Sequence, residues 1–262
     1  MEKEFLYTEE KIPEFREADA DGAVGMRGYL EYFQDAAATY MHRFGWGNDT
    51  VHERYGVAWV YTKYRMQVFE RTIFDHPLHV ECWIEPGRQS VGVRHAIEIS
   101  KEGALMARGR LESCILDLEN GRIRRLDAIG YESTLALPRE NPLPAYTRIE
   151  TDDAGMESVY THRVRYCDLD NNLHMNNLRY IPLLLDAYTP DFHAGHLLKD
   201  LEIHYRNQSL YDEELEILRI PEGEDCDRLI IRKEDGTPAA CARLIFSETE
   251  RIECLWAGSR PG

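Results

Sequence analysis

The order of periodicities in the first 118 residues constrains the fold most. Between Tyr29 and Phe44 the apolar residues recur three or four positions apart, which predicts an amphipathic helix of about four turns, ended by Gly45 and Gly47. Four segments with a period of two follow, at 59–69, 79–85, 91–100 and 104–118. Such alternation is typical of antiparallel strands with one covered face. A helix this apolar on one side packs most simply against a sheet that curls around it, so the fold class is α+β.

The second part of the chain repeats this order. Residues 133–156 carry three prolines and no clear period, which predicts a linker. The later part then matches the earlier part three times: DLD (168–170) matches DAD (19–21), DA (186–187) matches DA (35–36) if a gap of two residues is allowed, and EDG (234–236) matches KEG (101–103) with Ala and Arg-Leu following at the same spacing. We infer an internal duplication, with halves at 1–135 and 157–262 joined by 136–156. Each half is expected to be a long helix followed by an antiparallel sheet.

A polar stretch, YCDLDNNLHMNN at 166–177, distinguishes the second half from the first. It holds Asp170, Asn172 and His174 just before the apolar run IPLLLDAY. In an ungapped alignment, Ala23 and Gly25 stand at the positions of Asn172 and His174. Turn and helix-capping chemistry is the alternative explanation for such a stretch. A duplicated fold with a polar constellation in one copy alone favours an asymmetric enzyme.

These residues carry a family likeness. The segment DLDNNLHMNNLRYIPLLLDA resembles the D-x-D-x-N-x-H-x-N-N-x-x-Y segment of acyl–acyl-carrier-protein thioesterases of plants and bacteria, and WVYTKYRMQVFERTIFDHPLHVECWIEP resembles the strand pair after the first helix of that family. The likeness covers roughly residues 10–250. It implies a double (tandem) hotdog fold, in which each sheet wraps a central helix. It also implies hydrolysis of fatty acyl thioesters, with acyl carrier protein as the carrier, acyl-CoA as a second substrate, and no cofactor.

The resemblance also implies which residues act. The aspartate, asparagine and histidine of the family fall on Asp170, Asn172 and His174. The family continues with a glutamate in a Y-x-x-E-C segment, and here the matching YRNQS has Gln208 and Ser209 instead. A glutamine can orient a water molecule but cannot take its proton.

The chemistry of thioester hydrolysis suggests a role for each group. Asp170 activates water, with its pKa raised if Asp168 faces the same pocket. His174 bonds the water or protonates the leaving thiolate, and Asn172 positions the carbonyl group. The backbone N–H groups of Asn176 and Asn177, at the start of the next helix, are the expected oxyanion donors.

Two further expectations concern the helix and the acyl chain. Pro182 requires either a helix that begins near Ile181 or a short turn at 176–181 followed by a kink, and we favour the kink. By analogy with the family, the first half lines the acyl pocket. Its candidate residues there are Trp59, Met66 and Tyr32.

Other functions stay open on the sequence. A hotdog dehydratase or hydratase of 3-hydroxyacyl thioesters also pairs a histidine with a carboxylate, and a non-catalytic acyl-thioester-binding protein would accommodate Gln208. No G-x-S-x-G elbow surrounds Ser209 as a nucleophile. The HAGH segment at 193–196 lacks a third ligand, so we expect no metal site.

The net charge, the apolar runs and the cysteines limit the classes of partner and the location that we expect. A net charge of -16 argues against nucleic acid, and the local basic segments at 108–110 and 121–125 are the candidates for contact with an acidic carrier protein. No stretch of 18 or more apolar residues is present, so no membrane span is expected. The start lacks a signal-peptide pattern and the six cysteines are scattered, which predicts a reduced, cytoplasmic protein, with a homodimer left open.

Overall fold

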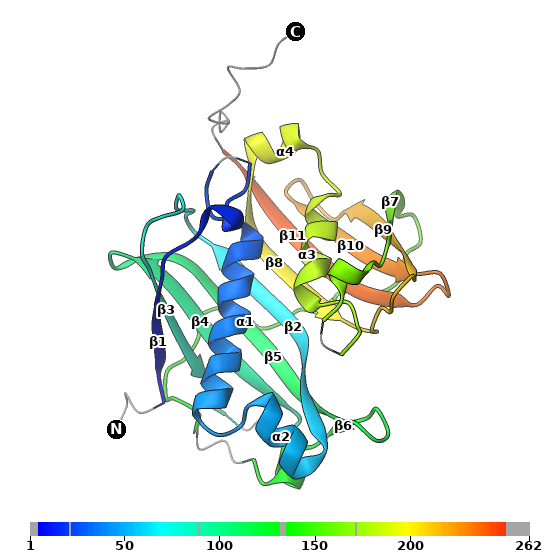
Figure 1. The fold of residues 1–262 in the computed structure, drawn as a ribbon. Coiled ribbons are helices and arrows are strands. Elements are labelled where there is room, and N and C mark those ends of the chain that lie inside the picture. Colours follow the sequence, from blue (N-terminus) through cyan, green and yellow to red (C-terminus); the bar gives the residue numbers. More distant parts are fainter. Residues whose placement is uncertain (1–4, 21, 88–89, 132–134, 171, 250–262) are drawn as a thin grey trace.

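The strands form one antiparallel sheet that runs through the whole molecule (Figure 1). The computed structural model describes residues 5–20, 22–87, 90–131, 135–170 and 172–249. Within them, eleven strands pair in the order β1-β3-β4-β5-β2-β8-β11-β10-β9-β7, with β6 beside β5. Their bounds are β1 Tyr7–Lys11, β2 Val57–Val68, β3 Leu78–Ile84, β4 Gly92–Lys101, β5 Ala104–Asp117, β6 Ile123–Arg124, β7 Glu157–Arg163, β8 His196–Tyr205, β9 Glu214–Pro221, β10 Cys226–Lys233 and β11 Pro238–Glu248.

The strand order confirms the duplication. Counted outward from the middle of the sheet, one half reads β2, β5, β4, β3, β1 and the other reads β8, β11, β10, β9, β7. Each half therefore has five strands connected in the same way, and β2 pairs with β8 to join the halves edge to edge. The predicted α+β double hotdog is confirmed, with its two sheets fused into one.

The helices differ in length between the halves. They are α1 Met26–Arg43, α2 Asn48–Tyr55, α3 Tyr180–Leu185 and α4 Pro190–Gly195. The long first helix and the four strands after it are confirmed, whereas the second half has the short α3 in place of an equally long helix. A 3-10 turn at Asn177–Arg179 leads into α3, which puts Pro182 in the first helical turn. The kink that we favoured is wrong, because a proline in the first turn removes no helical hydrogen bond.

Helix α1 packs closely against the first half of the sheet, as α3 does against the second (Figure 1). Its apolar face buries Tyr29, Phe33, Ala36 and Tyr40 completely. A Cβ atom at Gly109 of β5 would lie 1.7 Å from a ring carbon of Phe33, so only glycine allows the helix to approach the strand this closely.

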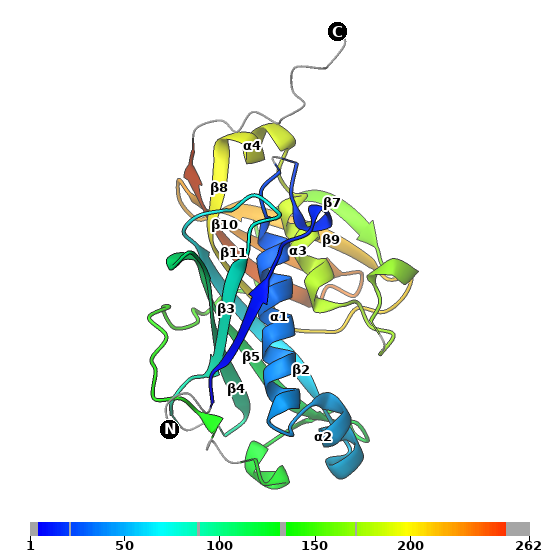
Figure 2. The same cartoon turned by 60° about the vertical axis from the view of Figure 1, so that its left-hand side comes forward.

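The segment between the halves crosses the face of the sheet away from α1 (Figure 2). Residues 138–156 contain no helix or strand. Arg65 donates to Ala145 O at 2.9 Å, Arg110 donates to Pro144 O at 2.8 Å, and the Tyr146 hydroxyl donates to Arg110 O at 3.0 Å. The predicted linker is thus held on the sheet by buried side chains.

A buried ionic network lies beneath this segment at the junction of the halves. Arg65 of β2 pairs with Asp200 of β8 at 3.1 Å and with Glu202 at 3.3 Å. His204 lies 2.8 Å from Glu202, which also accepts from Thr147 N at 2.7 Å. Burial acts to raise the pKa of Glu202, but these hydrogen bonds and the charge of Arg65 together lower it below its ordinary value. The network fixes both the linker and the β2–β8 junction.

Candidate functional site

The polar stretch of the second half folds into a tight loop, here the Asp170 loop (168–176). Asp170 N donates to His174 O at 2.8 Å, and the Asp170 Oδ1 accepts from Asn172 N at 2.8 Å and His174 N at 3.4 Å. Leu173 at the tip has a φ of 60°, in the left-handed region. Asp170 and His174 are half-buried and Asn172 is exposed. The three predicted residues therefore share one turn, which Asp170 shapes through its carboxylate.

The segment after β8 lies directly beside this loop. Met175 N donates to Ser209 O at 2.9 Å, and His174 forms a β-bridge with Leu210. Gln208, which the sequence resemblance predicts at the place of the family's glutamate, is exposed at this junction. Ser209 is fully buried, and its Oγ accepts from the Tyr180 hydroxyl at 2.9 Å. The structure thus joins the two predicted segments and gives Ser209 a structural partner.

The segment before α3 supplies fewer free backbone N–H donors than predicted. Asn176 N already donates to Asp168 O at 2.8 Å, and the Asn176 side chain accepts from Leu178 N. Asn176 is therefore wrong as an oxyanion donor, because the closure of the loop uses its amide. Asn177 N makes no hydrogen bond within the described part of the chain, while Asn177 O accepts from the Tyr205 hydroxyl at 2.8 Å.

The first half contains a loop with the same backbone pattern, here the Asp19 loop (17–25). Asp19 N donates to Ala23 O at 2.9 Å, as Asp170 N does to His174 O. Val24 N donates to Thr72 O at 2.8 Å, as Met175 N does to Ser209 O. The two loops are therefore structural copies.

This pattern corrects the alignment of the halves. It pairs Asp19 with Asp170 and Ala23 with His174, an offset of 151 residues that also pairs Asp35 with Asp186 and needs no gap. The pairing of Ala23 with Asn172 and of Gly25 with His174 is wrong by two residues. The identical residues in DLD and DAD favoured an offset of 149 residues, whereas the backbone hydrogen bonds support the offset of 151. The counterpart of Asn172, Asp21, lies outside the described residues.

The carboxylates of the two loops have different surroundings. Asp19 pairs with Arg71 at 3.0 Å, and its carboxylate fills the space that a Cβ at Gly25 would need. In the second half Asn176 occupies the place of Gly25 and Gln208 the place of Arg71. Asp170 makes no ion pair with any described residue. Sequence reasoning missed Arg71, since nothing local links it to a loop 52 residues earlier.

A set of tyrosines connects the Asp170 loop with the interior of the first half. The ring of Tyr205 lies 5.5 Å from that of Tyr180 and 5.9 Å from that of Tyr64, between centroids. Tyr64 donates to Gln34 of α1 at 2.9 Å. Burial raises the pKa of Tyr64 and Tyr205 well above the usual value, so both phenols stay neutral. Tyr180, four residues after the Asp170 loop, is therefore connected through Tyr205 and Tyr64 to Gln34 of α1.

The predicted pocket residues lie in the first half. Met66 is fully buried on the face of β2 that α1 covers. Tyr32 is buried on α1, with its hydroxyl donating to Glu17 at 2.7 Å. Trp59 is half-buried near the other end of the helix, where its Nε1 donates to Trp46 O at 2.7 Å. Met66 alone is free of polar contacts here and faces the core.

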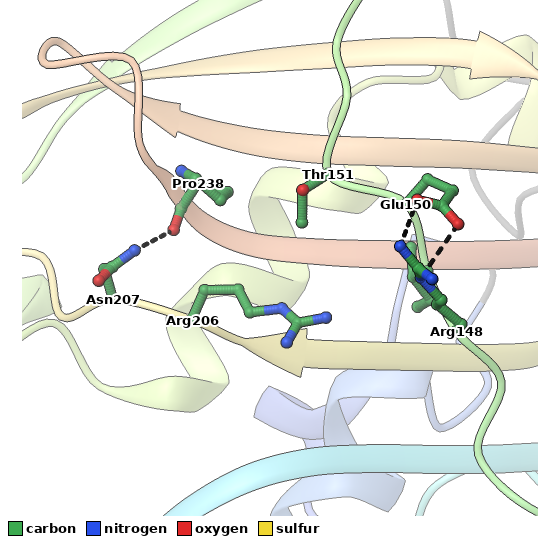
Figure 3. Close-up of a pocket in the computed structure, with 7 residues that line it drawn as sticks. Arg148, Glu150, Thr151, Arg206, Asn207 and Pro238 are labelled. Carbon is green, nitrogen blue, oxygen red and sulfur yellow. Dashed lines mark hydrogen bonds and ion pairs between the residues drawn. The ribbon is translucent and has the colours of Figure 1, made fainter.

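An open groove of about 480 Å³ lies on the opposite face of the sheet, beside the linker (Figure 3). Arg148 and Glu150, paired at 3.2 Å, form one side, and Arg206 and Asn207 form the other. None of the predicted site residues lines it. The groove therefore reaches the segment before Gln208 without including the Asp170 loop.

Most arginines of the predicted basic segments are paired with carboxylates. Arg110 is buried and pairs with Glu85 at 2.5 Å, and Arg108 pairs with Glu98 at 2.7 Å. Arg124 lies 3.5 Å from Asp117, and Arg125 pairs with Asp127 at 2.7 Å. The expectation of carrier contact at Arg110 is wrong, because that side chain anchors the linker.

Two other properties bear on the chemistry. Among the described residues, no group of three His, Cys, Asp or Glu side chains is arranged to hold a metal ion. Ring nitrogens of His193 and His196 each lie 2.9 Å from a backbone carbonyl oxygen. The described helices include none long and apolar enough to cross a bilayer.

Solved structures share this fold. An acyl-ACP thioesterase from Bacteroides thetaiotaomicron superposes with a TM-score of 0.83 at 19% identity, covering 94% of this chain and 100% of that one. The 12:0-ACP thioesterase from Umbellularia californica superposes with a TM-score of 0.78 at 16% identity, covering 94% and 98%. At these identities the likeness establishes the double hotdog fold.

Sequence comparisons also find similarity to acyl-carrier-protein thioesterases. Oleoyl-acyl carrier protein thioesterase 2 of Arabidopsis thaliana is 21% identical over 85% of this chain, and a dodecanoyl-[acyl-carrier-protein] hydrolase of Cinnamomum camphora is 22% identical over 79%. The matches span less than two thirds of those proteins, 65% and 57% of their lengths. Residues 151–248, which include the Asp170 loop, match the acyl-ACP thioesterase C-terminal domain. The second half of the chain is thus similar to the acyl-ACP thioesterase C-terminal domain, and most of the chain is similar to plant acyl-ACP thioesterases.

Proposed function

We propose that this protein hydrolyses fatty acyl thioesters carried on acyl carrier protein, releasing a free fatty acid and the carrier thiol. The observation that carries the proposal is the difference between the two loops. Arg71 neutralises the carboxylate of Asp19, whereas Gln208 stands at the equivalent place beside Asp170. A carboxylate without a paired cation keeps its capacity to accept a proton from water.

Each step of the reaction has a group in the Asp170 loop or in the segments next to it, Asn177 and Gln208. Asp170 takes a proton from a water molecule oriented by Gln208, and the water oxygen bonds to the thioester carbonyl carbon. The oxyanion that forms is stabilised by the Asn177 N–H and the Asn172 amide. When the carbon–sulfur bond breaks, the proton held by Asp170 returns through His174 to the thiolate sulfur. No cofactor is needed.

The two halves divide the work in this proposal. Residues 157–262 carry the reacting groups, and residues 1–135 hold the acyl chain between α1 and the sheet, with 136–156 as the connecting segment. The support is the buried apolar face of α1 and the tyrosine contacts that lead to it from the Asp170 loop. Activity on acyl-CoA, a cytoplasmic location and a homodimer stay predictions.

A product assay tests the proposal against its alternatives. The purified protein is incubated with acyl-acyl carrier protein and acyl-CoA of several chain lengths, including 3-hydroxyacyl forms, and the products are separated by mass. We expect free fatty acid and free thiol in equal amounts. An enoyl thioester would instead indicate a dehydratase, and tight binding of the thioester without any product would indicate a binding protein.

A further inference from the structure

The interior of the first half contains a buried histidine that has no hydrogen-bond partner. His95 is 1% exposed, and neither its Nδ1 nor its Nε2 is bonded to any described residue. It lies on β4 between Val93 and Ile97, whose side chains belong to the core that α1 covers. Buried polar atoms without partners cost free energy and are rare in native proteins. An apolar side chain at this position would avoid that cost.

A second unpartnered polar group lies in the same region. The Tyr131 hydroxyl is buried and has no hydrogen-bond partner among the described residues. The ring of Tyr40 lies 5.8 Å from that of His95. Tyr131 belongs to the same buried cluster as Tyr40, and after burial and Cys82 it is one of the causes that raise the pKa of Tyr40. His95 and Tyr131 therefore both lie in the part of the core around Tyr40.

Tyr40 itself does not satisfy either group. Its hydroxyl donates to Leu135 O at 2.9 Å and lies 3.2 Å from Phe5 O. The rings of Trp46 and Trp59 lie 4.8 and 6.0 Å from that of Tyr131, edge-on, and close the region toward α2. The two His95 ring nitrogens and the Tyr131 hydroxyl are thus buried beside aromatic rings and have no hydrogen-bond partner among the described residues.

The chemistry of the three atoms defines what they can bind. Burial lowers the pKa of His95 to about 3, so the ring is neutral and offers one N–H donor and one acceptor nitrogen. The Tyr131 hydroxyl can donate and accept. This set suits a hydroxyl or keto oxygen, whereas a carboxylate would find no positive charge there.

Strand register and helix geometry give the distance of His95 from Tyr64, one of the tyrosines that connect the Asp170 loop with the first half. His95 is in register with Leu111, which is in register with Tyr64. Two strand spacings therefore separate His95 from Tyr64, about 10 Å. Tyr40 follows Gln34, the partner of Tyr64, by six residues of α1, about 9 Å along the helix. A chain that enters beside Tyr64 and follows α1 would reach His95 with its distal part.

We propose that the first half binds acyl chains with a hydroxyl or keto oxygen on their distal part, and that His95 and Tyr131 form hydrogen bonds with that oxygen. The inference rests on the proposed function, because it takes the acyl chain of the thioester as the ligand. It makes His95 and Tyr131 specificity-determining residues for the substrate.

A matched substrate panel tests the inference. Acyl-acyl carrier proteins of one length are compared, plain or with a hydroxyl group moved stepwise along the distal half. For at least one hydroxyl position we expect kcat/KM at least tenfold above that of the plain chain, and His95→Leu and Tyr131→Phe should abolish that preference. Tyr131→Phe removes a single oxygen and preserves the packing. Ile97→Leu, on the same face of β4, is the control that should keep the preference.

A binding measurement separates this inference from the proposed function. Calorimetric titration of the wild type with free hydroxy fatty acids and with plain fatty acids needs no turnover. If no thioester is hydrolysed, the proposed function fails, whereas tighter binding of one hydroxy acid, lost in Tyr131→Phe, still supports the subsite. Equal binding of plain and oxygenated chains by the wild type, or a preference that survives both substitutions, would overturn it.

Discussion

Arg71 donates to the carboxylate of Asp19 at 3.0 Å, in the copy of the loop that lacks His174. The residue at the place of Arg71 in the second half is Gln208, and the carboxylate there belongs to Asp170. Structurally equivalent aspartates therefore stand in both halves: Asp19 is paired with a guanidinium, whereas Asp170 makes no ion pair with any described residue. In the proposed mechanism this difference distinguishes a structural aspartate, Asp19, from the proton acceptor, Asp170.

The first prediction concerns Gln208, which lies next to the Asp170 loop and cannot accept a proton. Gln208→Glu adds a proton acceptor beside the Asp170 loop, and we expect kcat/KM to rise by about tenfold or more. The gain should disappear below about pH 4.3, where a glutamate is protonated. Gln208→Met, of similar length, should show no gain. A pH–rate profile of Gln208→Glu that matches the wild type would put this position outside the chemistry.

Ser209 is predicted to be structural. Ser209→Ala removes the hydrogen bond from Tyr180 and should lower the free energy of unfolding by about 1 kcal/mol. Turnover should stay within about threefold of the wild type, because the loss is one of stability. Tyr180→Phe removes the same hydrogen bond and serves as the comparison. Loss of all turnover in Ser209→Ala alone would point to a serine nucleophile.

The contact of α1 with β5 predicts a packing defect. Gly109→Ala places a methyl group 1.7 Å from a ring carbon of Phe33, and overpacking of this kind costs about 1–3 kcal/mol. Urea unfolding measures the loss. Phe33→Leu in the Gly109→Ala background should recover part of it, because the two residues are coupled. Additive effects of the two substitutions would mean that they do not share this contact.

His95 predicts a dependence of stability on pH. The unfolded chain protonates this histidine below about pH 6.5. Burial lowers the pKa in the folded chain to about 3, so protonation favours the unfolded state between these values. Acidification from pH 7.5 to 4.5 should therefore cost the wild type about 2–3 kcal/mol more than His95→Leu. Chemical denaturation at both pH values measures this difference, and equal losses would show that His95 does not stay neutral in the folded protein.

Periodicity predicted the elements of the first half because helix and strand patterns are local. The same alternation indicates that His95 is buried. His95 is two residues from both Val93 and Ile97, so its side chain lies with theirs on the covered face of β4. The short α2 was missed because NDTVHERY is mostly polar. Three prolines correctly indicated irregular backbone at 138–156, but no local signal shows that the polar residues of β2 and β8 bind that segment.

The candidate site was less predictable than the fold. The sequence brought together Asp170, Asn172 and His174, because their spacing is short enough for one turn. The partner of Asp19 is a residue on another segment, and the amide of Asn176 is taken by a backbone oxygen. Both facts depend on tertiary hydrogen bonds, which a pattern of residue types does not contain. The alignment error of two residues between the loops has the same origin.

The most direct measurement compares Asp170→Asn with Asp19→Asn in hydrolysis of acyl-acyl carrier protein. The two substitutions are chemically identical and fall on structurally equivalent residues. Asp170→Asn should lower kcat/KM by about 100-fold or more, because it removes the proton acceptor, while thermal unfolding shows a folded protein. Asp19→Asn should keep full turnover and lose at most about 1 kcal/mol of stability from a half-exposed ion pair. Equal turnover by Asp170→Asn and the wild type would show that Asp170 is not the proton acceptor of the reaction.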